Sequence, residues 1–342
     1  MIFNVKEGKM NKILKKLLNL QLSKISFPIE IKVSYLGEGI LQLLPSVGFK
    51  KAVILSAGIH GNETAPIELL ARLIASLSKN TQRLNCALLI IFGNLPAIKL
   101  GKRYIHSDMN RLFFNHNQYE KLEKSINEVQ CVNLLKEAVQ KFLDNISLYD
   151  NIPCYHLDMH TTIRDSYFKQ FALLPHNANS YNKSFFELLF SCKLNAIVQH
   201  NSPNGTFSYY LSKHFGVQSC TIELGKAKSF GLNNLTLFQS IEFAIKSLIS
   251  GDNFIKEIKK IIRWFLVVES IIKTKDNFRL NLKPEIKNFT QLKPGYIIAY
   301  DDNHIWRINN DAPWILFPNS DVAFGLRACL LLRSTTIPYF TL

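Results

Sequence analysis

Predominantly apolar runs recur along the first 250 positions and predict a series of short buried strands. Residues 52–57 and 86–92 are rich in branched aliphatic side chains and each run ends at glycine, as expected of strands buried on both faces. Residues 31–44 carry short apolar runs around a Gly-Glu-Gly turn and predict a hairpin. Further short strands are predicted at 155–159, 196–199 and 219–223.

Between these runs, apolar residues recur with the spacing of amphipathic helices. The pattern predicts helices at 66–77, at 234–249 and over much of 117–146. The lysine-rich N-terminal stretch is interrupted by polar residues and lacks a cleavage site, so it predicts an amphipathic helix rather than a signal peptide. Strands that alternate with helices indicate an α/β fold, with a mostly parallel mixed sheet and helices on both faces.

The pattern changes near residues 250–253, which have the sequence Ser-Gly-Asp-Asn. Beyond them, short apolar runs are separated by turns rich in proline, glycine, asparagine and aspartate, which is typical of an all-β region. A length of 342 residues fits two domains. We therefore expect a catalytic domain at 1–250 and a small β-rich domain at 251–342.

Composition narrows the class of protein without assigning a function. No apolar run reaches the roughly 20 residues of a membrane-spanning helix, so no membrane association is expected. The six cysteines are scattered without a paired motif, which favours a reducing cytoplasm. The net charge of +15 is spread along the chain without a nucleic-acid-binding motif. We expect no nucleic-acid partner and instead a small anionic substrate, which a basic cleft would attract.

A histidine and a glutamate lie three residues apart, directly after the first buried strand. His60 and Glu63 fall at the carboxyl end of that strand, where open α/β sheets bind ligands. An imidazole nitrogen and a carboxylate oxygen are both ligands of zinc. The spacing alone also fits a glutamate at a helix start beside a core histidine, because such short matches arise by chance.

A third candidate ligand follows another predicted strand. Asp158 and His160 are two residues apart, so both project from one face of that strand. His160 is the natural third zinc ligand, and Asp158 can hydrogen-bond a ligating histidine from outside the ligand set. Three protein ligands leave one position open, which is typical of catalytic zinc. A buried Asp–His pair without metal is the alternative, and His156 is interpreted as a core histidine.

Two further segments carry polar residues beyond buried strands. Glu223 ends an apolar run, where partial burial raises a carboxyl pKa and suits it to proton transfer; a helix-capping glutamate is the alternative. The loop at 101–111 contains Arg103, Asn110 and Arg111. A guanidinium can grip a carboxylate or stabilise an oxyanion, although charged loops are more often merely solvated.

In chain order, these segments resemble the succinylglutamate desuccinylase/aspartoacylase family, which is related to the zinc carboxypeptidases. The resemblance rests on blocks that follow one another in the family's order. They are HGNETAP (60–66), GNLPAIKLGKRYIHSDMNRLF (93–113), DMHTTIRDSYFKQFALLP (158–175), GTFSYYL (205–211), CTIELGKAKSFGLNN (220–234) and ILFPNSDVAFGLRACLLL (315–332). The motifs FALLPH, GTFSYY and TIELGKAKSFG resemble the branch of the family that cleaves succinylglutamate more than they resemble aspartoacylase.

The resemblance implies a zinc-carboxypeptidase-like fold and a role for each matched residue. It implies that His60, Glu63 and His160 hold one Zn²⁺ ion. It implies that Glu223 is the catalytic glutamate, which moves the proton of the attacking water. Arg103 matches the arginine that polarises the scissile carbonyl, so the chain is expected to be an active zinc amidohydrolase.

The resemblance also implies a substrate and part of its binding site. Asn110 and Arg111 match the pair that holds the substrate carboxylate. The expected reaction is hydrolysis of N-succinyl-L-glutamate to succinate and L-glutamate, in arginine catabolism. The resemblance does not assign positions in this sequence to the residues that bind the succinyl carboxylate. Candidates for that role are Arg164, Lys226, Thr206 and Ser208.

Three alternative functions differ in what they predict. A deacylase of another N-acyl amino acid would prefer a substrate such as N-acetylaspartate. A zinc carboxypeptidase would cleave plain peptides, but the small β domain argues against it, because in related enzymes that domain narrows access to the site. A non-catalytic protein with a basic surface would contain no zinc and would bind nucleic acid in a salt-sensitive way.

Overall fold

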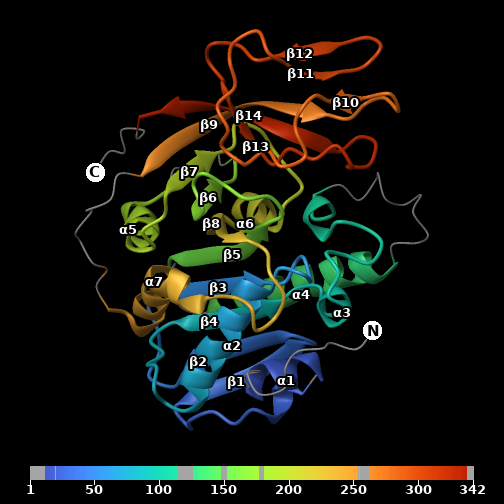
Figure 1. Cartoon of the computed structure of the whole chain (residues 1–342). Helices are drawn as coiled ribbons and strands as arrows, with labels where there is room; N and C mark the ends of the chain where they lie inside the picture. The colour runs from blue at the N-terminus through green and yellow to red at the C-terminus, as the bar shows by residue number, and fades with distance from the viewer. Residues whose placement is uncertain are drawn as a thin grey trace.

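The computed structural model describes residues 12–19, 21–114, 126–147, 152–176, 181–252, 254 and 262–336. A large twisted sheet runs through the molecule, with helices along both of its faces and a β-rich region at the C-terminal end (Figure 1). Among the described residues, no helix is both long enough and apolar enough to span a lipid bilayer.

In the described part of the chain, eleven strands form one mixed sheet. They are β1 (Ile31–Gly37), β2 (Ile40–Pro45), β3 (Ala52–Ala57), β4 (Ala87–Phe92), β5 (Cys154–Thr162), β6 (Phe171–Leu174), β7 (Ala196–Gln199), β8 (Gln218–Lys226), β9 (Arg263–Ile272), β13 (Trp314–Leu316) and β14 (Arg327–Thr335). Their spatial order is β1-β2-β4-β3-β5-β8-β6-β7-β9-β14-β13. The predicted hairpin is present, because β1 pairs antiparallel with β2.

The centre of the sheet is parallel, and this decides where the polar strand ends meet. β3 runs parallel to both β4 and β5, and β5 runs parallel to β8. The carboxyl ends of β3, β5 and β8 therefore lie at one edge of the sheet. β6 runs antiparallel to β8, which makes the sheet mixed. The predicted mostly parallel mixed sheet is confirmed.

Helices cover both faces of the sheet, as predicted. They are α1 (Lys12–Leu18), α2 (Thr64–Ser78), α3 (Leu95–Leu100), α4 (Ile126–Ser147), α5 (Lys183–Ser191), α6 (Phe207–Phe215) and α7 (Gln239–Ser250), with short 3-10 turns η2 (Leu22–Lys24), η3 (Met109–Arg111) and η4 (Leu235–Phe238). Apolar side chains of α1, α2, α5 and α7 pack into one core. Those of α4 and α6 pack into a second core against the opposite face.

Several elements differ in extent from the sequence-based expectations. The strand expected at 155–159 is longer, since β5 continues to Thr162. The helix expected at 234–249 starts as the 3-10 turn η4 before α7. Of the helical stretch expected at 117–146, residues 117–125 lie outside the described residues and the rest forms α4. The sequence analysis did not predict β6, α5 or α6, because these short segments carry weak periodic signals.

The C-terminal region continues the main sheet and adds a small second one. β9 pairs with β7, and β14 and β13 follow as the last strands of the large sheet. A separate three-stranded antiparallel sheet contains β10 (Arg279–Leu280), β11 (Ile297–Tyr300) and β12 (Ile305–Arg307). The predicted β-rich C-terminal region is therefore confirmed, while the exact domain boundary at 250/251 stays a prediction.

Candidate metal centre and active site

Two histidines and a glutamate from distant segments meet at the shared carboxyl edge of the sheet. His60 and Glu63 lie in the turn between β3 and α2, and His160 lies near the end of β5. All three side chains are buried. One ligand atom from each residue lies within 4.8 Å of the others, and such a group can hold a metal ion.

The turn that carries His60 and Glu63 is fixed by a glycine. The Cα of Gly61 lies so close to α3 that an added Cβ would be 2.2 Å from the carbonyl carbon of Ala97. No side chain fits in that space, so position 61 requires glycine. The Gly61 amide also donates a hydrogen bond of 3.0 Å to the carbonyl of Arg103. These contacts hold the turn against the loop that contains Arg103.

Both histidines direct the same ring nitrogen at Glu63. The Nδ1 atoms of His60 and His160 each lie 2.9 Å from a carboxylate oxygen of Glu63, one from each oxygen. The Nε2 atom of His60 faces Asp108 at 2.9 Å, and that of His160 faces Asp158 at 3.0 Å. An imidazole that donates its Nε2–H to a carboxylate presents the Nδ1 lone pair to a metal.

The chemistry of this donor set fits zinc. The Nδ1 atom of His60 is buried and makes no hydrogen bond within the described part of the chain, although Glu63 is near it. Burial opposes ionisation of Glu63, but His60 and His160 hold the pKa of its carboxyl well below the ordinary value. Two imidazole nitrogens and one carboxylate oxygen are a common ligand set of catalytic zinc.

Asp108 is a functional candidate that the sequence analysis missed. It supports the ring of His60 as Asp158 supports that of His160, and it also accepts a hydrogen bond of 3.0 Å from the Asn110 amide. Burial opposes ionisation, but His60 and Arg111 hold the pKa of Asp108 well below its ordinary value. The sequence feature that could have identified Asp108 is its position as the single acidic residue in the otherwise basic loop at 101–111.

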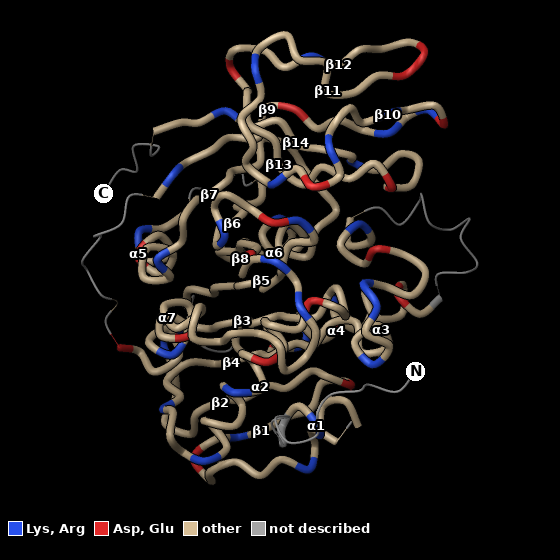
Figure 2. Tube along the Cα trace, in the orientation of Figure 1, with Lys and Arg blue, Asp and Glu red and all other residues tan. Residues whose placement is uncertain are grey.

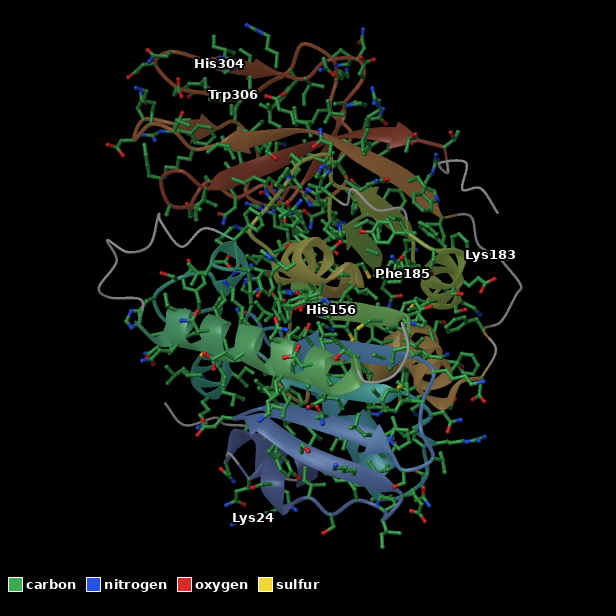
Figure 3. The ribbon with its side chains drawn as sticks, turned by 180° about the vertical axis from the view of Figure 1, so that it is seen from behind. Lys24, His156, Lys183, Phe185, His304 and Trp306 are labelled. Carbon is green, nitrogen blue, oxygen red and sulfur yellow. The ribbon has the colours of Figure 1, made fainter. Side chains whose placement is uncertain are left out.

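A buried chain of hydrogen bonds continues from Asp158 into the core. The Ser56 hydroxyl donates to Asp158 at 2.6 Å, so the Ser56 oxygen must accept from the Nε2–H of His156 at 2.9 Å. The Nδ1 of His156 then accepts from the Ser219 hydroxyl at 2.8 Å. Burial lowers the pKa of His156 to about 4, so the ring is neutral. His156 lies in the interior on β5 (Figure 3), as expected of a core histidine.

Asp108→Asn is expected to weaken zinc binding by about 10–100-fold, because partners of ligating histidines contribute this much to metal affinity. The asparagine oxygen can still accept the proton of His60 Nε2, but the negative charge that makes the ligating ring more basic is lost. Zinc dissociation constants, measured by competition with a chelator, test this expectation. Asp144→Asn is a matched control, because Asp144 is exposed on α4. Equal zinc affinities of Asp108→Asn and the unaltered protein would contradict the role of Asp108.

Glu223 lies beside the cluster on the neighbouring strand. It is the register partner of His160 in the parallel pairing of β8 with β5, and it is 7% exposed. Its Oε2 atom has no hydrogen-bond partner among the described residues. Burial, followed by the negative charge of Glu63, raises the pKa of the Glu223 carboxyl to about 8. The arrangement places a carboxyl that can exchange protons next to the candidate metal ligands.

Comparison with known proteins decides which family these residues belong to. Residues 50–249 match the catalytic domain of the succinylglutamate desuccinylase/aspartoacylase family, and residues 260–335 match the AstE/AspA barrel-sandwich hybrid domain. The chain belongs to the succinylglutamate desuccinylase/aspartoacylase family. The resemblance inferred from the sequence is thereby confirmed.

Curated relatives and solved structures of this family align with most of the chain. Succinylglutamate desuccinylase of Photorhabdus laumondii is 43% identical over 90% of this chain and 94% of the relative, and that of Serratia proteamaculans is 41% identical over 87% and 89%. The solved succinylglutamate desuccinylase from Chromobacterium violaceum is 30% identical, with a TM-score of 0.80 over 97% of this chain and 100% of that chain. The one from Vibrio parahaemolyticus is 27% identical, with a TM-score of 0.83 over 92% of each chain.

Within this family framework, Arg103 and Arg111 lie at the rim of the cluster. Arg103 donates a hydrogen bond of 2.6 Å to Glu63. Arg111 donates to the carbonyl of Asn110 at 3.0 Å, and its Nη2 lies 4.0 Å from Asp108. Both guanidinium groups remain partly exposed. Part of each positively charged group is therefore accessible beside the cluster.

Asn110 is buried between the cluster and α6. Its side-chain oxygen Oδ1 accepts a hydrogen bond of 2.9 Å from the Phe207 amide. Its Nδ2 lies 3.5 Å from the Nε2 of His160. Because that ring nitrogen already donates its proton to Asp158, the Asn110 amide cannot bond to it. The Nδ2 hydrogens of Asn110 stay available for a ligand.

The four residues considered as binding partners of the succinyl carboxylate do not gather at the cluster as a group. Arg164 donates from Nε to the Pro318 carbonyl at 2.6 Å and from Nη1 to the Pro284 carbonyl, so it ties β5 to the C-terminal region. Lys226 is exposed at the end of β8. Thr206 caps α6, and Ser208 bonds to Thr221. Their part in substrate binding stays a prediction.

Glu128 is a second residue that the sequence analysis missed. It is fully buried on α4 and accepts hydrogen bonds from the amides of Ile105 at 2.6 Å and His106 at 3.2 Å. These amides belong to the loop between Arg103 and Asp108. Glu128 therefore holds the loop that carries several site residues. No local sequence signal identifies it, because the contact depends on how α4 packs.

Proposed function

We propose that this chain hydrolyses the amide bond of N-succinyl-L-glutamate to succinate and L-glutamate, with one Zn²⁺ ion held by His60, Glu63 and His160. The observation that carries the proposal is the meeting of these three ligands with Glu223 directly beside them. The curated succinylglutamate desuccinylases that align over about nine tenths of the chain support this substrate.

The residues around the cluster supply the proton transfers of an amide hydrolysis. A zinc ion held there would polarise the amide carbonyl and lower the pKa of a water molecule. Glu223 accepts a proton from the attacking water and returns it to the amine nitrogen of the departing glutamate. Arg103 stabilises the negative charge that develops on the carbonyl oxygen. One water molecule is consumed, and its atoms appear in the two products.

The substrate is held by groups that recognise carboxylates. Asn110 donates from Nδ2, and Arg111 offers a partly exposed guanidinium beside it. The substrate carries three carboxylates, which suits a chain with a net charge of +15. Lysine and arginine residues lie along the whole chain rather than in one patch (Figure 2). We further propose that the reaction takes place in the cytoplasm, in arginine catabolism.

Metal analysis combined with a substrate panel tests the proposed function. We expect about one zinc per chain in purified protein and the highest kcat/KM for N-succinyl-L-glutamate. The same assays with N-acetyl-L-aspartate and with a plain dipeptide separate the alternatives. Preference for N-acetyl-L-aspartate would replace the proposed substrate, and efficient dipeptide cleavage would indicate a carboxypeptidase. Protein that binds no zinc and cleaves none of them would overturn the assignment as an amidohydrolase.

A further inference from the structure

Arg327, the first residue of β14, belongs to the C-terminal region but lies close to the candidate active site. Two hydrogen bonds connect its surroundings to β5. Arg164, just beyond β5, donates to the Pro318 carbonyl at 2.6 Å, and the Asn319 amide donates to the Ala328 carbonyl at 2.8 Å. The start of β14 is therefore held near the strand end that carries His160.

The guanidinium of Arg327 forms no ion pair within the described part of the chain. The side chain is half-buried, and its head group makes no hydrogen bond with any described residue. Burial, followed by the positive charge of Arg111, lowers the pKa of Arg327 to about 9, and Asp108 acts on it in the opposite direction. Arg327 pairs with Ile272 on β9, and β9 lies beside β7, whose following loop packs against Arg111 at Gly205. The start of β14 is therefore on the side of the molecule where Asp108 and Arg111 act on the Arg327 head group.

His200, directly after β7, faces the same positive charges. It is buried, and its amide donates to the Leu174 carbonyl at 2.9 Å. Burial, followed by the charges of Arg327, Arg111 and His176, lowers the pKa of His200 to about 3, so its ring is neutral. Behind Arg111, the loop after His200 is tightly packed, since a Cβ on Gly205 would lie 2.8 Å from the Arg111 carbonyl oxygen.

Two arginines from different parts of the chain thus share the influence of one carboxylate, that of Asp108, which lies 4.0 Å from Arg111. That carboxylate is already used by His60 and the Asn110 amide. A guanidinium withdrawn from water without a partner is costly, so the arrangement favours an anionic ligand. A molecule with two separated carboxylates satisfies both groups.

We propose that Arg327 binds a second carboxylate of the substrate while Arg111 binds the first. The inference rests on the proposed function, in which the substrate is an N-acylated glutamate with a further carboxylate on its acyl group. Two carboxylates have the required chemistry: the free end of the succinyl group and the side-chain carboxylate of glutamate. On this inference, the C-terminal region supplies a residue that sets substrate specificity.

The test compares three substrates in the unaltered protein and in Arg327→Met. N-succinyl-L-glutamate has both carboxylates, N-butanoyl-L-glutamate lacks the one at the acyl end, and N-succinyl-L-glutamine lacks the side-chain charge. For the full substrate, we expect Arg327→Met to lower kcat/KM by about 10–100-fold, the effect of losing a charged hydrogen bond. The analogue that lacks the recognised carboxylate should show almost no further loss. That selective result also identifies which carboxylate Arg327 binds.

Equal losses for all three substrates, or none, would overturn the inference. Arg333→Met is the matched control, because Arg333 lies on the same strand with an exposed side chain and should leave all three rates unchanged. Arg327→Lys keeps the charge and should show the same selectivity with a smaller loss, which covers the case in which Arg327→Met does not fold. If the unaltered protein cleaves none of the three substrates, the proposed function itself fails.

Discussion

Glu223→Ala is expected to lower kcat by about 10²–10⁴-fold while the protein keeps its zinc. The reason is the position of Glu223, which is a neighbour of the cluster but not one of the three grouped ligands. Its removal deletes the carboxyl that carries the proton from water to the departing amine. Steady-state kinetics with N-succinyl-L-glutamate and zinc analysis of the same sample measure the two quantities.

Two further variants make the Glu223 experiment specific. Glu223→Gln keeps the shape of the side chain but cannot accept a proton, so its kcat should fall as far as that of Glu223→Ala. Glu68→Gln is the matched control, because Glu68 is a partly buried glutamate on α2 that bonds to Gly231 and Asn233. A rate for Glu223→Gln close to that of the unaltered protein would remove Glu223 from the proton transfer.

His160→Ala is expected to abolish both zinc retention and turnover. The substitution removes one of three ligand atoms and also leaves Asp158 buried without the ring to which it is bonded. A buried carboxylate that loses its partner is destabilising, so a lower melting temperature should accompany the loss of metal. Zinc content after dialysis, turnover and thermal unfolding are the three measurements.

His304→Ala is the matched control, because it removes a histidine that lies outside the metal centre. His304 is exposed and makes an edge-to-face contact with Trp306 at the far end of the C-terminal region (Figure 3). It should keep zinc, activity and melting temperature unchanged. Full zinc occupancy in His160→Ala would show that the ion is held elsewhere, and the proposed metal centre would then be wrong.

The continuity of the large sheet gives the C-terminal region a direct structural link to the site. β9 pairs with β7, and Asn201 in the loop after β7 donates to the Val268 carbonyl on β9. Arg164 makes a second connection, from the end of β5 to Pro318. The region that follows α7 is therefore joined to the strands whose ends carry the candidate site, and residues such as Arg327 can take part in substrate binding.

The sequence by itself determined the elements whose signals are local. The apolar runs at 52–57 and 196–199 coincide with β3 and β7, because a buried parallel strand needs apolar side chains on both faces. The same logic placed His60 and His160 beyond strand ends, where the parallel register later brings them together. The ordered motifs identified the family, because each keeps the residue types that its chemistry needs.

Only the tertiary structure decided which side chains meet across long separations. Asp108 bonds to His60 across 48 residues, and the ring nitrogens that face Glu63 are set by these aspartate partners. Arg164 bonds to Pro318 across 154 residues, and the Asn319 amide bonds to Ala328 beside Arg327, which connects the start of β14 to the segment after β5. Such contacts depend on the packing of whole elements, and local periodicity carries no information about them. The sequence therefore supplied the chemical groups, and the fold selected their partners.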